Sequence, residues 1–285
     1  MNKVFACVDG VGNTAAVCDC AAWSALRLDV PLEFLHVLDR HPERAPVRDL
    51  SGAIGLGAQE SLLQELSALD ERRSKLAQEH GRQLLQAAKQ RAAQAGVERV
   101  DARQRHGELV ETVLEMEADA RLFVMGEHHH ATGTAKLHLD HHVERVIRAV
   151  KRPVLVVTHE EFEAPQRFGI AFDGSATGRK TVETLARSPM LKGLPCCVLM
   201  AREDDAFARD QISWARTTLA AAGFEVDAAV LAGEPEAVLA QQMRARGIGL
   251  LVMGAYGHSR IRNLIVGSTT TTMLRTSEVP VLILR

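Results

Sequence analysis

The sequence predicts an α/β protein of two tandem, doubly wound domains, each with a five-stranded, mainly parallel sheet. Three observations predict this fold: short apolar runs alternate with helical patterns, the runs are apolar on both faces, and the whole pattern occurs twice. Strands that are apolar on both faces are typical of parallel sheets covered by helices. A chain of 285 residues is also long enough for about two domains.

The duplication is visible in matched segments that keep the same order in both halves. One pair ends in Asp-Gly, a second pair ends in Val-Met-Gly, and a third pair is a short apolar run around Pro-Val. A fixed internal repeat of this kind indicates two copies of one structural unit. We therefore divide the chain into domains at 1–160 and 165–285. The matched segments are 6–10 with 170–174, 122–126 with 250–254, and 152–157 with 279–284.

Each domain is predicted to begin with a buried strand and a helix. The strands, 4–8 and 168–172, are apolar runs that end at Asp-Gly turns. Helices follow at about 13–28 and 177–187. Because the carboxyl ends of parallel strands share one edge of a sheet, the Asp-Gly turns are expected to lie beside the Met-Gly turns of the fourth strands.

The remaining elements continue the alternation of strand and helix. Glycines at 96 and 223 are expected to end the second helices. A third helix, a fourth strand that ends in Met-Gly, and a closing helix and strand complete each domain. The second strands are predicted at 32–38 and 195–200, the second helices at about 60–94 and 205–222, and the third strands at 97–104 and 224–231.

The second helix of the first domain, about 60–94, is longer than the sheet that it should cover. It either kinks near Gly81 or overhangs the domain and contacts another subunit. Leucines along its length favour packing against its own sheet for most of the helix.

The composition excludes several classes of protein. The formal net charge is −2, so nothing overall attracts the chain to nucleic acid or to an anionic membrane. No apolar run approaches the roughly 20 residues that span a bilayer, and the first residues do not resemble a secretory signal. The five cysteines form no disulfide framework. We expect a cytoplasmic protein with no nucleic acid and no membrane as partner.

A glycine-rich loop in the second domain, residues 254–268, is the strongest functional signal. Gly254 and Gly257 let a ligand approach the main chain, and Gly267 and Ser268 open a helix whose free N–H groups favour anions. The segment 250–277 contains no acid. This pattern is typical of a polyphosphate site, although it lacks the Gly-Lys-Ser/Thr of a P-loop. The alternative is a plain surface turn.

The spacing Gly254-x2-Gly257-x9-Gly267-Ser268 resembles the ATP-binding signature of the universal stress protein (UspA-like) family. The resemblance covers nearly the whole chain as two copies. It implies a Rossmann-like fold of the adenine nucleotide alpha hydrolase type, with ATP bound in the second domain, together with Mg²⁺ or Mn²⁺. It also implies that the final strands pair, so that the two domains form an internal pseudo-dimer, and it leaves room for a homodimer of whole chains. The nucleotide-binding residues that it implies are Asp173, Met200, Ala201, Met253, Gly254, Gly257, Arg260, Gly267, Ser268 and Thr269.

The same loop in the first domain has different residues. Alignment of the closing helices places Asp140 on Gly267 and His129 on Gly257, so a carboxylate occupies a position expected to hold phosphate. We therefore expect no ATP in the first domain. Imidazoles in place of the glycines suggest a second possibility, a Zn²⁺ site, against the alternative of a decayed, solvated loop. The candidate metal ligands are His129, His138, His141 and His142.

No set of catalytic residues is recognisable in the sequence. The chain has no nucleophile elbow and no nucleophile with a paired His and acid. The preferred hypothesis is a stress-response protein that binds ATP and acts as a nucleotide-dependent signalling module. The alternatives are a slow ATPase, or a protein that binds a metal or another small molecule through its His-rich first half.

Overall fold

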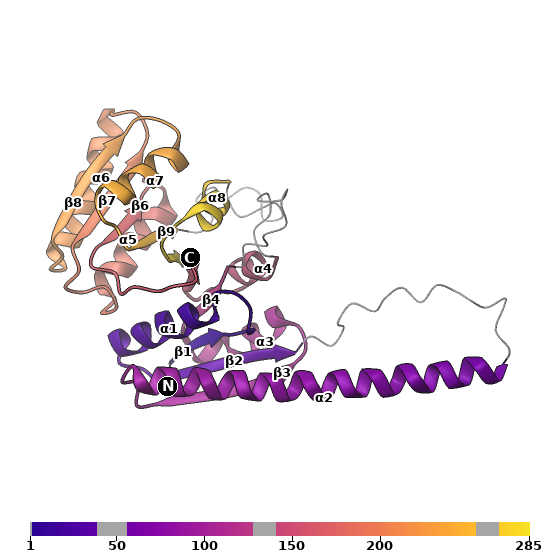
Figure 1. The fold of residues 1–285 in the computed structure, drawn as a ribbon. Coiled ribbons are helices and arrows are strands. Elements are labelled where there is room, and N and C mark those ends of the chain that lie inside the picture. Colours follow the sequence, from indigo (N-terminus) through magenta and orange to yellow (C-terminus); the bar gives the residue numbers. More distant parts are fainter. Residues whose placement is uncertain (1, 39–55, 128–140, 255–267) are drawn as a thin grey trace.

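The computed structural model describes residues 2–38, 56–127, 141–254 and 268–285 (Figure 1). In these residues the strands form one sheet of ten, in the order β3-β2-β1-β4-β5-β10-β9-β6-β7-β8. Every neighbouring pair is parallel except β5 with β10. The predicted fold class is confirmed, and both halves have the same strand order.

The strands fall close to their predicted positions. Those of the first half are β1 (Lys3–Cys7), β2 (Leu32–Leu38), β3 (Val100–His106), β4 (Ala120–Gly126) and β5 (Val154–Val157). Those of the second half are β6 (Phe168–Ala171), β7 (Cys196–Ala201), β8 (Val226–Leu231), β9 (Leu250–Gly254) and β10 (Val281–Leu284).

The helices cover both faces of the sheet. The side chains of α1, α2, α5 and α6 pack into one buried cluster, and those of α3, α4, α7 and α8 pack into a second cluster on the other face. The helices are α1 (Thr14–Leu28), α2 (Leu56–Gln94), α3 (Leu109–Met116), α4 (His141–Ala149), α5 (Ala176–Arg187), α6 (Ala206–Ala221), α7 (Pro235–Ala245) and α8 (Ser268–Thr276), with a short 3₁₀ turn at Glu117–Asp119.

The two halves meet at the closing strands. Leu155 of β5 lies opposite Leu282 of β10 in an antiparallel ladder, which joins the halves into one sheet. Thr158 donates a hydrogen bond from its hydroxyl to the carbonyl of Val279 at 3.0 Å. Arg285 reaches back to the carbonyl of Arg148 at 2.9 Å. The apolar edges of β5 and β10 are therefore both covered, as edge strands require.

Helix α2 follows one of the two alternatives considered for it, the overhang. It runs through Gly81 as one helix, from Leu56 to Gln94. A Cβ at Gly81 would lie 2.6 Å from Cδ2 of His36, so the missing side chain lets the helix cross closely over β2. Residues 64–77 are exposed, and the expectation that most of the helix packs on its own sheet is wrong. Figure 1 shows this part of α2 projecting beyond the first half.

Candidate functional site

Two cavities lie at the carboxyl ends of the central strands, one in each half. In each half the strand order reverses between the first and fourth strands, which are β1 and β4 in the first half and β6 and β9 in the second. Doubly wound sheets bind ligands at this point, because the connections there leave in opposite directions. We call them the first cavity, of about 340 Å³, and the second cavity, of about 310 Å³.

The second cavity has an apolar wall and a polar rim. The wall comes from β6, β7 and α7, and the rim comes from the turns and helix ends that follow β6 and β9. Asp173 lies two residues after the end of β6, and its Oδ1 accepts a hydrogen bond from the N–H of Ser175 at 2.9 Å. This turn fixes the carboxylate at the mouth. The lining residues are Ala171, Phe172, Asp173, Ser175, Thr177, Gly178, Leu199, Ala201, Pro235, Leu239, Met253, Gly254, Thr269 and Thr270.

Two helices point their amino ends at this rim. Ser175 caps α5, and its hydroxyl accepts a hydrogen bond from the N–H of Gly178 at 3.0 Å. Helix α8 begins at Ser268, so Thr269 and Thr270 belong to its first turn. The first N–H groups of a helix lack partners within the helix and carry the positive end of its dipole. The rim is therefore suited to hold an anion.

Two glycines allow α5 to lie close to the strand ends. A Cβ at Gly178 would lie 2.5 Å from Oδ1 of Asp173, and a Cβ at Gly254 would lie 3.1 Å from the side chains of Thr177 and Thr181. Larger residues at 178 would displace the Asp173 carboxylate. At Gly254 the glycine thus serves close packing between helix and sheet, in addition to any role in ligand approach.

The structure brings five of the predicted binding residues to the second cavity: Asp173, Ala201, Met253, Gly254 and Thr269. Gly257, Arg260 and Gly267 lie outside the described residues. Ser268 begins α8, but its side chain also lies outside them.

Met200 was predicted to line the nucleotide site, but it does not line the second cavity. It is 1% exposed and belongs to the cluster under α5 and α6, on the face of the sheet opposite the cavity. Successive side chains of a strand point to opposite faces. Leu199 and Ala201 therefore line the cavity, whereas Met200 does not.

Four polar or small residues of the rim were not predicted: Ser175, Thr177, Gly178 and Thr270. The signal for the first three was present, because Ser175 is a typical helix cap directly after the Asp173-Gly174 turn. Thr270 follows Thr269 in the first turn of α8 and could have been included for the same reason.

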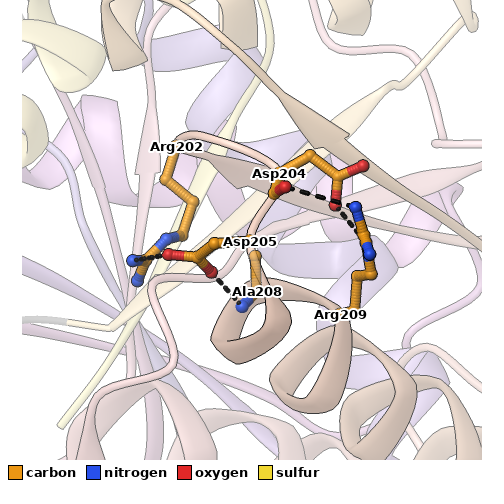
Figure 2. A network of polar contacts seen from close by, with 5 residues as sticks. All are labelled: Arg202, Asp204, Asp205, Ala208 and Arg209. Atoms are coloured by element: carbon orange, nitrogen blue, oxygen red, sulfur yellow. Dashed lines mark hydrogen bonds and ion pairs between the residues drawn. The ribbon is translucent and has the colours of Figure 1, made fainter.

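A polar network closes the turn after β7, beside Ala201 (Figure 2). Asp205 caps α6 by accepting a hydrogen bond from the N–H of Ala208 at 2.7 Å, and Arg202 donates to its other oxygen at 2.9 Å. These contacts, the hydrogen bond from Ala208 first, lower the pKa of Asp205. Arg209 pairs with Asp204 at 2.8 Å on the next turn. The network fixes the start of α6 next to the cavity wall.

The first cavity has the same plan and a different lining. Asp9, Met125 and Gly126 correspond to Asp173, Met253 and Gly254. His142 and Val143 stand where the second cavity has Thr269 and Thr270. The lining residues are Cys7, Val8, Asp9, Val11, Leu35, Val37, Gly107, Glu108, Leu109, Met125, Gly126, His142 and Val143.

Cys7 in this lining is not a ready thiolate. Burial, with a smaller contribution from the charge of Asp9, raises the pKa of the Cys7 thiol to about 12. The thiol therefore stays protonated near neutral pH, and a protonated thiol is a poor nucleophile and a poor metal ligand.

The histidines proposed as metal ligands are only partly described. His142 lines the first cavity and is exposed. His141 begins α4, with its side chain outside the described residues, and His129 and His138 lie outside them entirely. Within the part of the chain that the structure describes, no three His, Cys, Asp or Glu side chains gather into a metal-binding group. The Zn²⁺ site stays a prediction.

None of the helices in the described ranges combines the length and apolar character needed to cross a membrane. Even α2, with 39 residues, is mostly polar and charged along its sequence.

Comparison with known proteins gives consistent matches. A family model described as "Universal stress protein family" matches residues 1–158 and 197–285. A universal stress protein of Synechocystis sp. is 33% identical over 288 residues, covering 100% of both chains.

Solved structures agree on the fold. A universal stress protein from Archaeoglobus fulgidus matches with a TM-score of 0.76 at 18% identity, covering 100% of this chain and 98% of the other. A Pseudomonas aeruginosa protein of unknown function matches with a TM-score of 0.62 at 16% identity, covering 100% of this chain and 92% of the other. Since the family model and the Synechocystis relative both extend over the two halves, the chain belongs to the universal stress protein family.

Proposed function

We propose that the second cavity binds an adenine nucleotide, ATP with Mg²⁺ or Mn²⁺, and that the protein acts as a nucleotide-dependent stress-response module. The observation that carries the proposal is the arrangement of the cavity: an apolar wall, a fixed carboxylate and two helix amino ends around one space of about 310 Å³. Pockets for small ligands commonly have volumes of roughly 300–1,000 Å³, with few polar groups that set the orientation.

Each part of the cavity suits one part of a nucleotide. The apolar wall, with Leu199, Ala201 and Leu239, suits the flat base. The carboxylate of Asp173 suits hydroxyl donors such as those of ribose. The first turn of α8, with Thr269 and Thr270, suits the phosphates.

The divalent cation is proposed on the chemistry of its donors. Mg²⁺ prefers oxygen ligands, keeps several waters and is usually held through substrate phosphates with one or two protein oxygens. The rim offers the hydroxyls of Thr269 and Thr270 and the carboxylate of Asp173. These residues fit a cation that arrives with the nucleotide.

A binding role is proposed rather than hydrolysis. Among the described residues that line the second cavity, Asp173 is the only acid, and histidine is absent from them. The proposal already assigns Asp173 to the ribose hydroxyls and the cation. General-base catalysis needs a group free to accept a proton from the attacking water, and the described lining supplies no second candidate.

Titration calorimetry with ATP and MgCl₂ tests the proposal. We expect one nucleotide per chain for the native protein. Asp173→Ala should weaken binding by about tenfold to a hundredfold, because a hydrogen bond to a charged group contributes about 1.5–3 kcal/mol. Asp9→Ala is the matched control, since Asp9 holds the same position in the first cavity, and it should leave the affinity unchanged.

Two results would contradict the proposal. One is the absence of binding by the native protein at millimolar ATP. The other is the reverse pattern, in which Asp9→Ala weakens binding and Asp173→Ala does not. A further variant, Gly257→Glu, places an acid in the acid-free loop and should also weaken binding.

A further inference from the structure

The exposed part of α2 is the least covered helical segment of the described chain. All of residues 64–77 are exposed, including three leucines. Leu66 is 43%, Leu69 is 53% and Leu76 is 71% exposed. An isolated helix of about 12–15 residues is only marginally stable in water, because most helical stability in proteins comes from packing. An overhang with an apolar side therefore needs a surface to pack against.

The leucines follow the spacing of a coiled coil. Leu66, Leu69, Arg73 and Leu76 are separated by three, four and three residues, which is the a/d pattern of a heptad repeat. The ion pair between Lys75 and Glu71, at 2.6 Å, lies at c and f positions on the opposite side of the helix. The overhang thus has one seam of three leucines and Arg73, and one charged outer side.

We propose that this overhang binds the same segment of a second copy of the chain, as an antiparallel two-stranded coiled coil. Leu66 packs against Leu69 of the partner subunit, and the twofold axis repeats the contact. The occupant is a second copy because two features of the segment are complementary to themselves: its flanking charges, and the length of helix that precedes the body.

The flanking charges select the antiparallel arrangement. Glu65 and Arg72 occupy g positions, and neither forms an ion pair among the described residues. In the antiparallel register Glu65 lies beside Arg72 of the partner subunit. A parallel pair instead places Glu65 beside Asp70 of the partner subunit and Arg73 against Arg73 of the partner subunit, and both contacts repel.

The length of the overhang fits the same register. Helix α2 begins at Leu56 and contacts its own body from Gln78 onward, where the carbonyl of Gln78 accepts a hydrogen bond from Gln104 of β3 at 3.3 Å. With Leu66 opposite Leu69 of the partner subunit, residues 58–77 of the two chains pair along their whole length. The register therefore places the two bodies at opposite ends of the paired segment.

The strands that join the two halves offer no competing contact, because β5 and β10 are already paired with each other. The proposal does not rest on nucleotide binding, and each can fail without the other.

Sedimentation of the full chain tests the proposal over a wide range of concentration. The native protein should reach twice the 31.1 kDa mass of one chain as concentration rises. Leu66→Glu with Leu69→Glu should remain a monomer with unchanged ATP binding, because both residues are exposed and far from the cavities. Leu114→Glu is the control, since Leu114 is 42% exposed on α3, and it should still dimerise.

Charge reversal tests the register. Glu65→Arg alone and Arg72→Glu alone should each raise the dimer dissociation constant about tenfold, since each change affects two symmetric pairs. The two changes together should restore it. A native chain that stays monomeric at all concentrations overturns the proposal, as does a dimer that survives the leucine changes. A dimer strengthened by Glu65→Arg alone shows a parallel pair and overturns the antiparallel one.

Discussion

The two cavities share their fold position and differ in what lines their mouths. Both have an aspartate after the first strand and a Met-Gly at the end of the fourth. The second places Thr269 and Thr270 at the first turn of its closing helix, where the first places His142 and Val143. The strand order creates a cavity in both halves, so a cavity alone does not indicate a nucleotide. The two cavities differ most clearly at the helix ends that line their mouths.

The largest expected effect is a difference in stability between alanine variants at two equivalent glycines, Gly126 and Gly254. A Cβ at Gly126 would collide with Oδ1 of Asn13, whose amide donates to the carbonyls of Glu127 at 3.1 Å and Val157 at 2.8 Å. Gly126→Ala should therefore cost about 2–4 kcal/mol, because the added methyl overpacks the site and the displaced Asn13 amide leaves the carbonyl of Glu127 without that hydrogen bond, whereas the carbonyl of Val157 keeps the N–H of Glu127. Gly254→Ala meets only the side chains of Thr177 and Thr181 and should cost about 1 kcal/mol.

Urea unfolding of both variants measures this difference. If Gly254→Ala proves as destabilising as Gly126→Ala, the asymmetry that the contacts of Asn13 imply is wrong.

The next effect tests whether the mouth residues decide the ligand. Thr269→His with Thr270→Val gives the second cavity the residues of the first and should weaken ATP by about tenfold to a hundredfold, through loss of hydroxyl donors to a charged ligand. The reciprocal change, His142→Thr with Val143→Thr, should leave the stoichiometry at one nucleotide per chain. The position of Asp140 in the loop predicts this outcome. Calorimetry gives both quantities, and a second nucleotide in the reciprocal variant would show that the two threonines are sufficient.

The smallest effect concerns the connection after the second strand. In the second half, Asp205 caps α6, and its pKa is lowered by the hydrogen bond from Ala208 and by Arg202. A carboxylate with a lowered folded pKa stabilises the fold above its unfolded pKa and loses that contribution as the pH falls through the folded pKa. Asp205→Ala should therefore lower the melting temperature slightly at neutral pH and less at acid pH.

Asp205→Asn is the matched variant, because asparagine caps helices almost as well as aspartate. Asp205→Asn should retain most of the native melting temperature. The small difference from the native protein should shrink as the pH falls, because Asp205 is then protonated in the native protein. If Asp205→Ala lowers the melting temperature by the same amount at all pH values, the charge of Asp205 does not contribute to stability.

Most of the fold was predictable from the sequence, since apolar runs and glycine stops determine the order of elements. Strand β2 was predicted at its observed bounds, 32–38. Strand β3 begins three residues later than expected, at Val100, because Val97 belongs to the turn after α2 and donates its N–H to the carbonyl of Ala92. Such turns use apolar residues that resemble the start of a strand.

The misses have specific physical causes. Met200 was assigned to the site by its position at a strand end, but the alternation of faces along β7 directs it into the opposite core. The sequence favoured packing of α2 on the sheet of its own chain over an overhang. Leucines alone do not distinguish a helix that packs on its own sheet from one that packs on another chain. Half of the predicted nucleotide-binding residues line the second cavity, and Gly257, Arg260 and Gly267 remain sequence predictions.

Through the antiparallel pairing of β5 and β10, each half covers the apolar edge strand of the other half. Leu155 and Leu282 lie opposite each other in two strands that are far apart in the chain. The contact between the halves therefore comes from strand pairing and does not depend on the peptide that connects them. We expect two separately translated halves to present matching apolar edges, through which they can pair without a linker. A gene split near residue 160 is therefore a practical route to a hybrid, in which one half is exchanged for that of a relative and the other is kept.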